Sequence, residues 1–318
     1  MTYPDLDIYS LDQDAQIVDA LSAASFLRTV PELTSKRIFI IGRRKKGSSV
    51  RKLSRILMVL ASAAIVSGTS TTLAAETHLM GIVIMHGKGG SPTRYVSDLA
   101  RALESRGYLV ANLEMPWSGR RDYDVDVSHA EEEVESALAT LRSKGAKKVF
   151  VAGHSQGGLF ALHFAGKHTA DGIIAIAPGG SVNSPLFHQK LGESVARARQ
   201  LVADGKGNEK ERLNDFESSK GIYQVIATPS NYLTWFDPDG AMNMVRAVRA
   251  VNPAIPVLWI APTGDYPLLR KSAHPMFGDL PANAFHKRVE PESDHLGAPT
   301  ASIEEIVRWT TTVANARE

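Results

Sequence analysis

The sequence predicts an α/β domain: a doubly wound, mostly parallel sheet flanked by helices, with a small helical insertion. Two observations predict this fold class. From residue 80 onward, short apolar runs alternate with helical patterns, which is the order that builds a parallel sheet covered by helices. One apolar run, at 148–152, ends abruptly in Gly-His-Ser-Gln-Gly, and a helical pattern follows it. We assign residues 76–318 to this domain.

The first half of the domain repeats the strand and helix unit regularly. We expect strands at 80–85, 108–113, 148–152 and 172–177, because these runs are short, apolar and bounded by polar or turn residues. The intervening segments 92–105, 127–144 and 158–165 have helical patterns. In the first of these, Tyr95, Leu99 and Leu103 are expected on one helix face.

Residues 181–253 interrupt this rhythm with a long, polar, partly helical stretch. It contains a charged run at 206–217 and the aromatic residues Tyr223, Tyr232, Trp235 and Phe236. We expect this insertion to form part of a lid. Regularity returns with strands at 256–261 and 285–289 and a closing helix at 303–314.

Composition excludes several classes of function. The net charge of +2 arises from the first 75 residues, which hold ten Lys or Arg against six Asp or Glu; 26 against 28 remain for residues 76–318, or −2. The domain lacks a basic stripe with interleaved aromatics, so we expect no nucleic-acid partner. There is no cysteine, which excludes disulfides, thiolate metal sites and a cysteine nucleophile. We expect no metal and no organic cofactor.

Residues 43–75 resemble an export signal in an unusual place. A basic segment at 43–55 precedes an apolar run at 56–66, and small residues at 71–75 offer a cleavage site before Glu76. The apolar run is shorter than the roughly 20 residues a membrane span needs, so we predict a cleaved signal and an exported, periplasmic or secreted protein with no stable span. A membrane anchor through 56–75 is the alternative.

The 42 residues before this segment have two explanations, which stay open. Translation begins near Val50 or Met58, or residues 1–42 are a genuine extension without recognisable chemistry. N-terminal sequencing of the exported protein distinguishes them, and a mature chain that keeps Met1 would exclude export.

The stretch Gly153-His154-Ser155-Gln156-Gly157 is typical of a nucleophile elbow. A strand that turns sharply into a helix strains its corner residue, and the residues two before and two after it must be small. Gly153 and Gly157 meet that need. The turn exposes the Ser155 hydroxyl and aims the backbone N–H of Gln156 toward the same space. Ser155 is therefore the candidate nucleophile.

A serine nucleophile needs a base, and the base needs an orienting acid. Asp265 follows the strand at 256–261 and His295 follows the last strand, where a parallel sheet collects its functional groups. The order Ser155, Asp265, His295 is the one expected for this triad on a doubly wound sheet. Asp294 is the main rival acid, but chain neighbours generally point apart.

The tetrahedral intermediate also needs two backbone donors for its oxyanion. Gln156 offers one. The run His86-Gly87-Lys88-Gly89-Gly90 follows the first strand, and its glycines let the backbone approach a substrate closely. We expect the second donor to be the N–H of Lys88, with that of Gly87 as the alternative.

These motifs resemble those of serine hydrolases of the α/β-hydrolase superfamily. The resemblance rests on residues 86–90, 153–157, Asp265 and His295, and covers about 80–315. The run from Ala152 to Gly158 resembles carboxylesterases and small thioesterases, and the layout resembles dienelactone-hydrolase-like proteins, although those use a cysteine at the elbow. The resemblance to serine hydrolases implies hydrolysis of an ester or thioester through an acyl-enzyme intermediate.

The substrate pocket is expected between the segment 116–121 and the aromatics of 223–236. We expect Trp117, Arg120 and Trp235 to contact a small-molecule ester or thioester, short-chain or soluble because 181–220 is too polar for an apolar lid. Two alternatives remain open: an acyltransferase or cofactor-free haloperoxidase using the same triad, and a non-catalytic protein that binds a small molecule on this fold.

Overall fold

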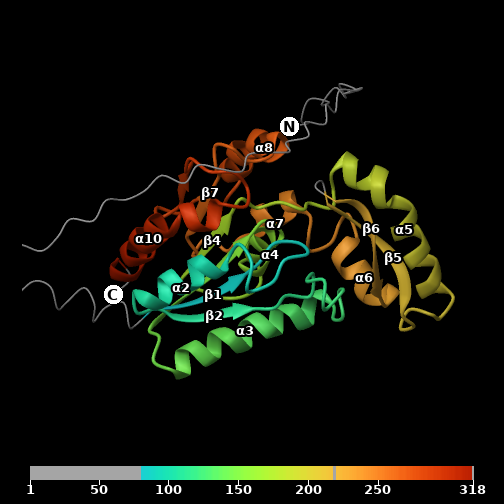
Figure 1. Cartoon of the computed structure of the whole chain (residues 1–318), viewed down its shortest axis with the longest axis horizontal. Helices are drawn as coiled ribbons and strands as arrows, with labels where there is room; N and C mark the ends of the chain where they lie inside the picture. Colours follow the sequence, from blue (N-terminus) through green and yellow to red (C-terminus); the bar gives the residue numbers. More distant parts are fainter. Residues whose placement is uncertain (1–79, 218–219, 317–318) are drawn as a thin grey trace, which may run out of the picture. The chain divides into compact units, whose positions relative to one another are not determined.

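The computed structural model describes residues 80–217 and 220–316 (Figure 1). The predictions for the N-terminal extension and the export signal lie outside the described residues. Within the described part of the chain, no helix is long and apolar enough to cross a membrane.

The predicted doubly wound sheet is confirmed. Six strands run parallel in the order β2-β1-β3-β4-β7-β8. The chain leaves β1 to one side for β2 and then crosses to the other side for β3, so the topology switches between β1 and β3. Ligands bind at such switch points, beyond the carboxyl ends of the strands. The six strands are β1 (Met80–Met85), β2 (Leu109–Leu113), β3 (Lys148–His154), β4 (Gly172–Ile176), β7 (Val257–Ile260) and β8 (Lys287–Val289).

Side-chain alternation along the strands builds one hydrophobic core on each face of the sheet. Ile82, Ile84 and their counterparts on other strands pack against one helical layer, α2 (Ser97–Ser105), α9 (Ala298–Ala301) and α10 (Ile303–Asn315). Val83 and Met85 face the second layer, α3 (Val127–Ser143), α4 (Gln156–Phe164), α7 (Met244–Ala250) and α8 (Pro267–Gly278). Burial on both faces explains why these strands are continuous apolar runs.

The insertion is not purely helical. Between α5 (Pro185–Ala203) and α6 (Pro229–Phe236), strands β5 (Glu211–Glu217) and β6 (Gly221–Ala227) form an antiparallel hairpin. The charged run at 206–217 largely becomes β5, in which Leu213 and Asp215 are buried. Figure 1 shows α5, β5, β6 and α6 grouped at one end of the sheet.

Two predictions about helices need correction. The helix expected from residue 92 begins at Ser97; Tyr95 lies before it, 42% exposed and with a φ of 55°, and Val96 is buried instead. Helix α8 was not predicted, because Pro275 lies inside it and Ala273 is its one fully buried residue, which leaves little apolar periodicity to detect.

Candidate active site

Ser155 lies at a sharp corner between β3 and α4. Its φ is 54° and its ψ −116°, a conformation that L residues rarely adopt. Four backbone hydrogen bonds hold it: its N–H donates to the carbonyl of Ile176, and its carbonyl accepts from the N–H groups of Gly158, Leu159 and Gly179. The surrounding backbone thus imposes the strained geometry of an elbow.

The two flanking glycines are required by contact. A Cβ on Gly153 would lie 2.0 Å from the carbonyl oxygen of Gly157, and one on Gly157 would lie 2.7 Å from the carbonyl oxygen of Met85. Neither position can hold a side chain without moving backbone. The G-x-S-x-G spacing therefore follows from packing at this turn.

His295 and Asp265 form a buried pair. His295 Nδ1 donates to Asp265 Oδ1 at 2.7 Å, and the backbone N–H of Tyr266 donates to the same oxygen at 2.7 Å. Their side chains are 8% and 4% exposed. With Nδ1 committed as a donor, the neutral imidazole keeps its free lone pair on Nε2, the state that a general base needs.

Two loops are held side by side to make this pair. The N–H of Gly264 donates to the carbonyl of Ser293 at 2.9 Å, next to a parallel bridge between Gly264 and Asp294. The rival acid Asp294 turns away from His295 and accepts from the N–H of Gly297 at 2.7 Å.

His154 ties the His295 loop to the elbow. Its Nε2 donates to the backbone carbonyl of His295 at 2.8 Å, and the two rings lie 4.9 Å apart. Burial and, to a smaller extent, the nearby His295 together lower the pKa of His154 to about 3. His154 is therefore neutral, and its side chain braces the histidine loop instead of facing the Ser155 hydroxyl.

Gly87 lies directly against Ser155. A Cβ on Gly87 would be 3.1 Å from Ser155 Cβ, which puts the loop at 86–90 beside the candidate nucleophile. Ser155 Oγ has no hydrogen-bond partner among the residues that the structure describes. A hydrogen bond between a nucleophile and its general base is often long in ligand-free enzymes and shortens when substrate binds.

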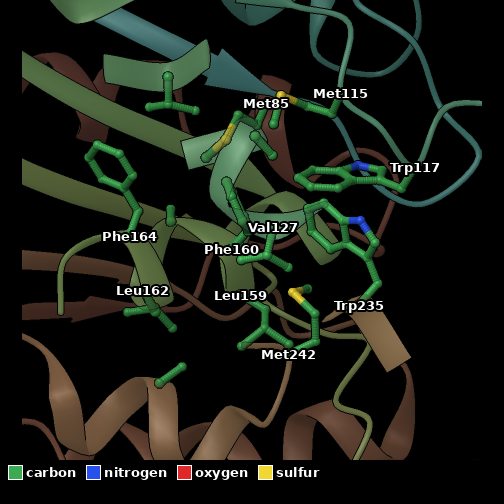
Figure 2. Packing of buried hydrophobic residues seen from close by; sticks show 14 of the residues in the cluster. Met85, Met115, Trp117, Val127, Leu159, Phe160, Leu162, Phe164, Trp235 and Met242 are labelled. Carbon is green, nitrogen blue, oxygen red and sulfur yellow. The ribbon is translucent and has the colours of Figure 1, made fainter. Parts of the chain in front are cut away.

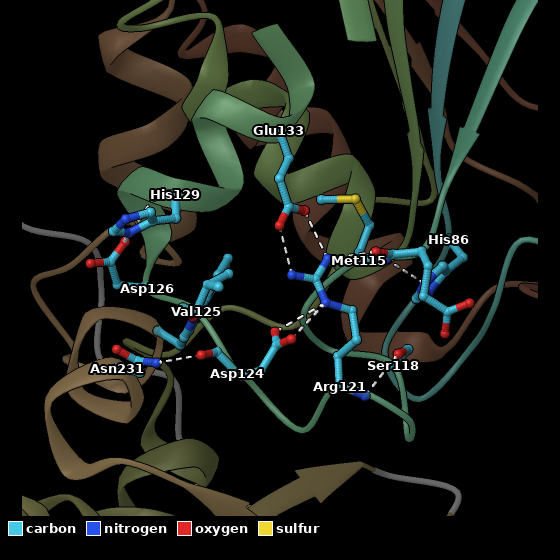
Figure 3. Close-up of polar contacts among 12 residues, drawn as sticks. His86, Met115, Ser118, Arg121, Asp124, Val125, Asp126, His129, Glu133 and Asn231 are labelled. Atoms are coloured by element: carbon cyan, nitrogen blue, oxygen red, sulfur yellow. Dashed lines mark hydrogen bonds and ion pairs between the residues drawn. The ribbon is translucent and has the colours of Figure 1, made fainter. Parts of the chain in front are cut away.

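Hydrogen bonds of the His86 side chain and of Trp117 hold the backbone of the loop at 86–90. His86 Nε2 accepts from the N–H of Met115 at 3.0 Å, so its Nδ1 carries the proton and donates to the carbonyl of Gly87 (Figure 3). Burial lowers the pKa of His86, in keeping with this neutral tautomer. Trp117 Nε1 donates to the carbonyl of His86, and its own carbonyl accepts from the N–H of Gly89.

The backbone N–H groups of Lys88 and Gln156 donate to no other group in the described part of the chain. They are thus available to a ligand, as an oxyanion hole requires. The side chain of Lys88 points elsewhere, into an ion pair with Asp215.

The three residues expected to contact substrate lie in different environments. Trp117 and Trp235 are 2% and 1% exposed and pack edge to face, with Phe160 against both, as Figure 2 shows. Aromatic side chains near a pocket gain more by completing the core than by facing solvent. Arg120 is exposed and pairs with Glu114. Its neighbour Arg121 binds Glu133 through two nitrogens (Figure 3).

Sequence reasoning missed Tyr266 and Asp215. The Tyr266 ring lies 4.7 Å from the His295 ring and is 40% exposed, so it borders the site. Its position next to Asp265 was a usable signal. Asp215, fully buried, gave none, because it stands in a charged run that is typical of a solvated surface.

A cavity of about 390 Å³ adjoins the acid between the ends of β4 and β7 and helix α8. Asp265, Pro178 and Leu269 are among its lining residues, whereas Ser155 and His295 are not.

Comparison with known proteins points to hydrolases. A family model described as serine aminopeptidase, S33, matches residues 78–222, which include the 86–90 loop and the elbow but neither Asp265 nor His295. Esterase EstD of Thermotoga maritima is 27% identical over 108 residues, 30% of this chain and 26% of the esterase. The chain thus spans about a quarter of the length of this curated relative.

Solved structures share the fold. The α/β hydrolase GrgF of Penicillium sp. aligns with a TM-score of 0.55 and 15% identity, covering 73% of this chain and 88% of its own. The monoacylglycerol lipase of Paleococcus ferrophilus aligns at 0.51 and 20%, covering 73% and 94%, and a thermostable carboxyl esterase of Bacillus coagulans at 0.52 and 15%, covering 74% and 89%. The chain therefore has the α/β-hydrolase fold, and the solved structures that share this fold include an esterase and a lipase.

Proposed function

We propose that this protein is a serine hydrolase that cleaves a carboxylic ester or thioester through an acyl-enzyme intermediate. One observation carries the proposal: a serine stands in a strained elbow, and its chain neighbour His154 is hydrogen-bonded to the backbone of His295, which forms a buried pair with Asp265. Fold alone would not support it, because this fold hosts many chemistries.

In the first half of the reaction, Ser155 Oγ attacks the carbonyl carbon while His295 Nε2 takes the hydroxyl proton. Asp265 stays ionised and stabilises the imidazolium that forms. The tetrahedral intermediate collapses as the bond to the alcohol or thiol oxygen or sulfur breaks, and His295 returns the proton to that leaving group. Water then repeats the sequence on the acyl-serine ester and releases the acid and free Ser155.

The oxyanion lies between the N–H groups of Lys88 and Gln156 in this mechanism, with the N–H of Gly87 as the alternative to that of Lys88. Support comes from the contact of Gly87 with Ser155 and from the absence of competing acceptors among the described residues. One such donor contributes roughly 10²–10³-fold to kcat.

The substrate in this proposal is a small, soluble or short-chain ester. The partly exposed Tyr266 and Leu296, next to Asp265 and His295 respectively, offer a modest apolar rim. The similar proteins are named as an esterase and a monoacylglycerol lipase, whereas the matching family model is named for an aminopeptidase. The test therefore compares ester substrates with amide substrates.

The test is a panel of p-nitrophenyl esters of graded acyl length, with amino-acid p-nitroanilides as the amide arm. We expect turnover that falls with chain length and little amide cleavage. Ser155→Ala should lower kcat about 10⁴-fold or more and abolish fluorophosphonate labelling, whereas the exposed Ser143→Ala should change neither. Undiminished activity in Ser155→Ala would refute the proposal. Acyl transfer to an added alcohol, or failure of the folded wild type to label, would favour the acyltransferase or the binding protein.

A further inference from the structure

We propose that Asp215, in the insertion hairpin, positions the oxyanion hole by anchoring the side chain of Lys88, the residue that supplies one of its two backbone donors. This rests on the proposed hydrolase function. The hairpin would then be a working part of the active site and not a detachable lid.

Asp215 is the centre of a buried polar network. It is fully buried, and its Oδ1 accepts from Lys88 Nζ at 2.6 Å and from the N–H of Phe216 at 2.6 Å. Its Oδ2 accepts from the hydroxyls of Tyr123 and Tyr223, each at 2.8 Å. A carboxylate removed from water needs several donors of this kind, so the network is self-consistent only when it is complete.

The first arm of the network reaches the oxyanion loop through Lys88. Its ammonium also donates to the carbonyl of Phe216 at 3.2 Å and lies 5.6 Å from the centre of the Phe236 ring. A Cβ on Gly89 would lie 2.7 Å from Lys220 Nζ, so the end of the hairpin rests on this loop. A glycine-rich loop has little stiffness of its own, and the Lys88 side chain ties it to a rigid hairpin.

The second arm passes through Tyr123 to the segment that supports the same loop. Asp122 and Tyr123 both have positive φ, 48° and 57°, a strained pair that delivers the buried Tyr123 hydroxyl to Asp215. Burial raises the pKa of Tyr123 well above its usual value and the Asp215 charge raises it further, so the hydroxyl remains a neutral donor. The N–H of Tyr123 donates to the carbonyl of Pro116 at 2.7 Å, and the carbonyl of the next residue, Trp117, accepts from the N–H of Gly89 in the oxyanion loop at 2.9 Å.

One carboxylate thus holds the loop that carries the Lys88 donor, through the Lys88 side chain and through Tyr123 on the adjoining segment. Oxyanion donors act only within a narrow range of about 2.7–3.1 Å, and a small displacement of the loop costs catalysis without costing substrate binding. If Asp215 only attached the insertion to the domain, its loss would lower the stability of the protein but would not weaken binding of the transition state more than binding of the substrate.

Asp215→Asn tests the proposal, because it keeps the shape but leaves the Lys88 ammonium without its counter-ion. We expect kcat for a p-nitrophenyl ester to fall about 10–100-fold with KM within about threefold. The inhibition constant of a trifluoromethyl ketone, which forms an oxyanion on the serine, should rise by the same factor. Wild-type kcat and inhibition constant in a folded Asp215→Asn variant would overturn the proposal.

The matched control is Glu131→Gln. Glu131 is another buried carboxylate that accepts hydrogen bonds from three side chains, but it joins α3 to the end of α4. It should lower the Tm while leaving kcat and the ketone inhibition constant unchanged. Equal catalytic losses in both variants would mean that Asp215 is merely structural.

If Asp215→Asn does not fold, Lys88→Met and Asp215→Leu are combined with Tyr123→Phe and Tyr223→Phe, so that apolar groups replace the ion pair and no tyrosine hydroxyl is left without its acceptor, a change that buried ion pairs often tolerate. We expect this combined variant to fold and to remain at least tenfold slower than wild type; wild-type rates would overturn the inference. Complete but slower fluorophosphonate labelling of this variant would show that Ser155 is still reactive. The proposed function is tested separately, by Ser155→Ala.

Discussion

At the scale of single residues, backbone strain at Ser155 is the clearest mark of function. A non-glycine residue in such a conformation costs about 1–3 kcal/mol and persists only where its surroundings impose it. The hydrogen bonds from Gly158, Leu159 and Gly179 to the Ser155 carbonyl supply that constraint. The flanking glycines remove the contacts that would oppose it.

Gly153→Ala should therefore be severely destabilising. Its new Cβ would lie 2.0 Å from the carbonyl oxygen of Gly157, and relief requires movement of the elbow. We expect a loss of more than about 4 kcal/mol in the free energy of unfolding, measured by urea denaturation, or failure to fold.

Gly192→Ala is the control. Gly192 lies inside α5 with nothing within 4 Å of a Cβ, so alanine should stabilise the protein by about 0.5–1 kcal/mol. Similar stabilities of the two variants would contradict a steric role for Gly153.

At the scale of elements, a buried charge cluster joins α3 to the end of α4. Glu131, on α3, accepts from His163 Nε2 at 2.7 Å, Lys167 Nζ at 2.9 Å and His168 Nε2 at 3.0 Å. His168 also reaches Glu135 through Nδ1 and stacks on Phe164. This clamp holds the end of α4 against α3.

The clamp makes a pH-dependent contribution to stability. Burial alone would raise the pKa of Glu131, but the three donors outweigh it and lower the pKa to about 2. Because the folded value lies below the unfolded one, the contribution is complete above about pH 4.5 and is lost as the pH falls toward 2. Glu131→Gln should cost on the order of 3 kcal/mol at pH 7.

Urea denaturation of Glu131→Gln and wild type at pH 7 and pH 3 checks this prediction. The difference between the two proteins should be clearly smaller at pH 3. A difference that is constant with pH would show that the carboxylate charge contributes nothing.

At the scale of the whole molecule, the site gathers at the carboxyl edge where the sheet topology switches between β1 and β3. Loops after four strands meet there: 86–90 after β1, the elbow after β3, Asp265 after β7 and His295 after β8. His154 links two of these loops from a buried position, where desolvation disfavours the charged ring. Protonating His154 in the folded state should therefore cost stability at this edge.

Acid should therefore destabilise the protein through His154. Its pKa falls from 6.5 unfolded to about 3 folded, so the unfolded chain binds the proton more strongly and stability decreases as the pH falls from about 6.5 toward 3. His154→Gln, which keeps a donor near the position of Nε2, should show a weaker loss of Tm between pH 7 and pH 5. The exposed His188→Gln should behave as wild type. An unchanged slope in His154→Gln would rule out this histidine as the source of acid sensitivity.

Much of the sheet could be predicted because its signals are local. The runs that became β1 and β3 are apolar on both faces and end in turn residues. The hairpin could not, because β5 is mostly polar and two of its residues, Leu213 and Asp215, are buried, whereas a charged run is usually solvated. Trp117 and Trp235 were assigned to the pocket from their position in the chain, whereas packing against Phe160 decides their place.

The sequence by itself determined the order of the candidate site residues along the chain. A serine lies at a glycine-flanked corner after one strand, and an acid and a histidine follow later strands. These are short-range patterns whose cause is backbone geometry. Only the tertiary structure decided that Asp265 and not Asp294 faces His295, and that Asp215 joins Lys88 and Tyr123. Those partners lie 127 and 92 residues from Asp215 along the chain, and a contact over such separations depends on the packing of the whole domain.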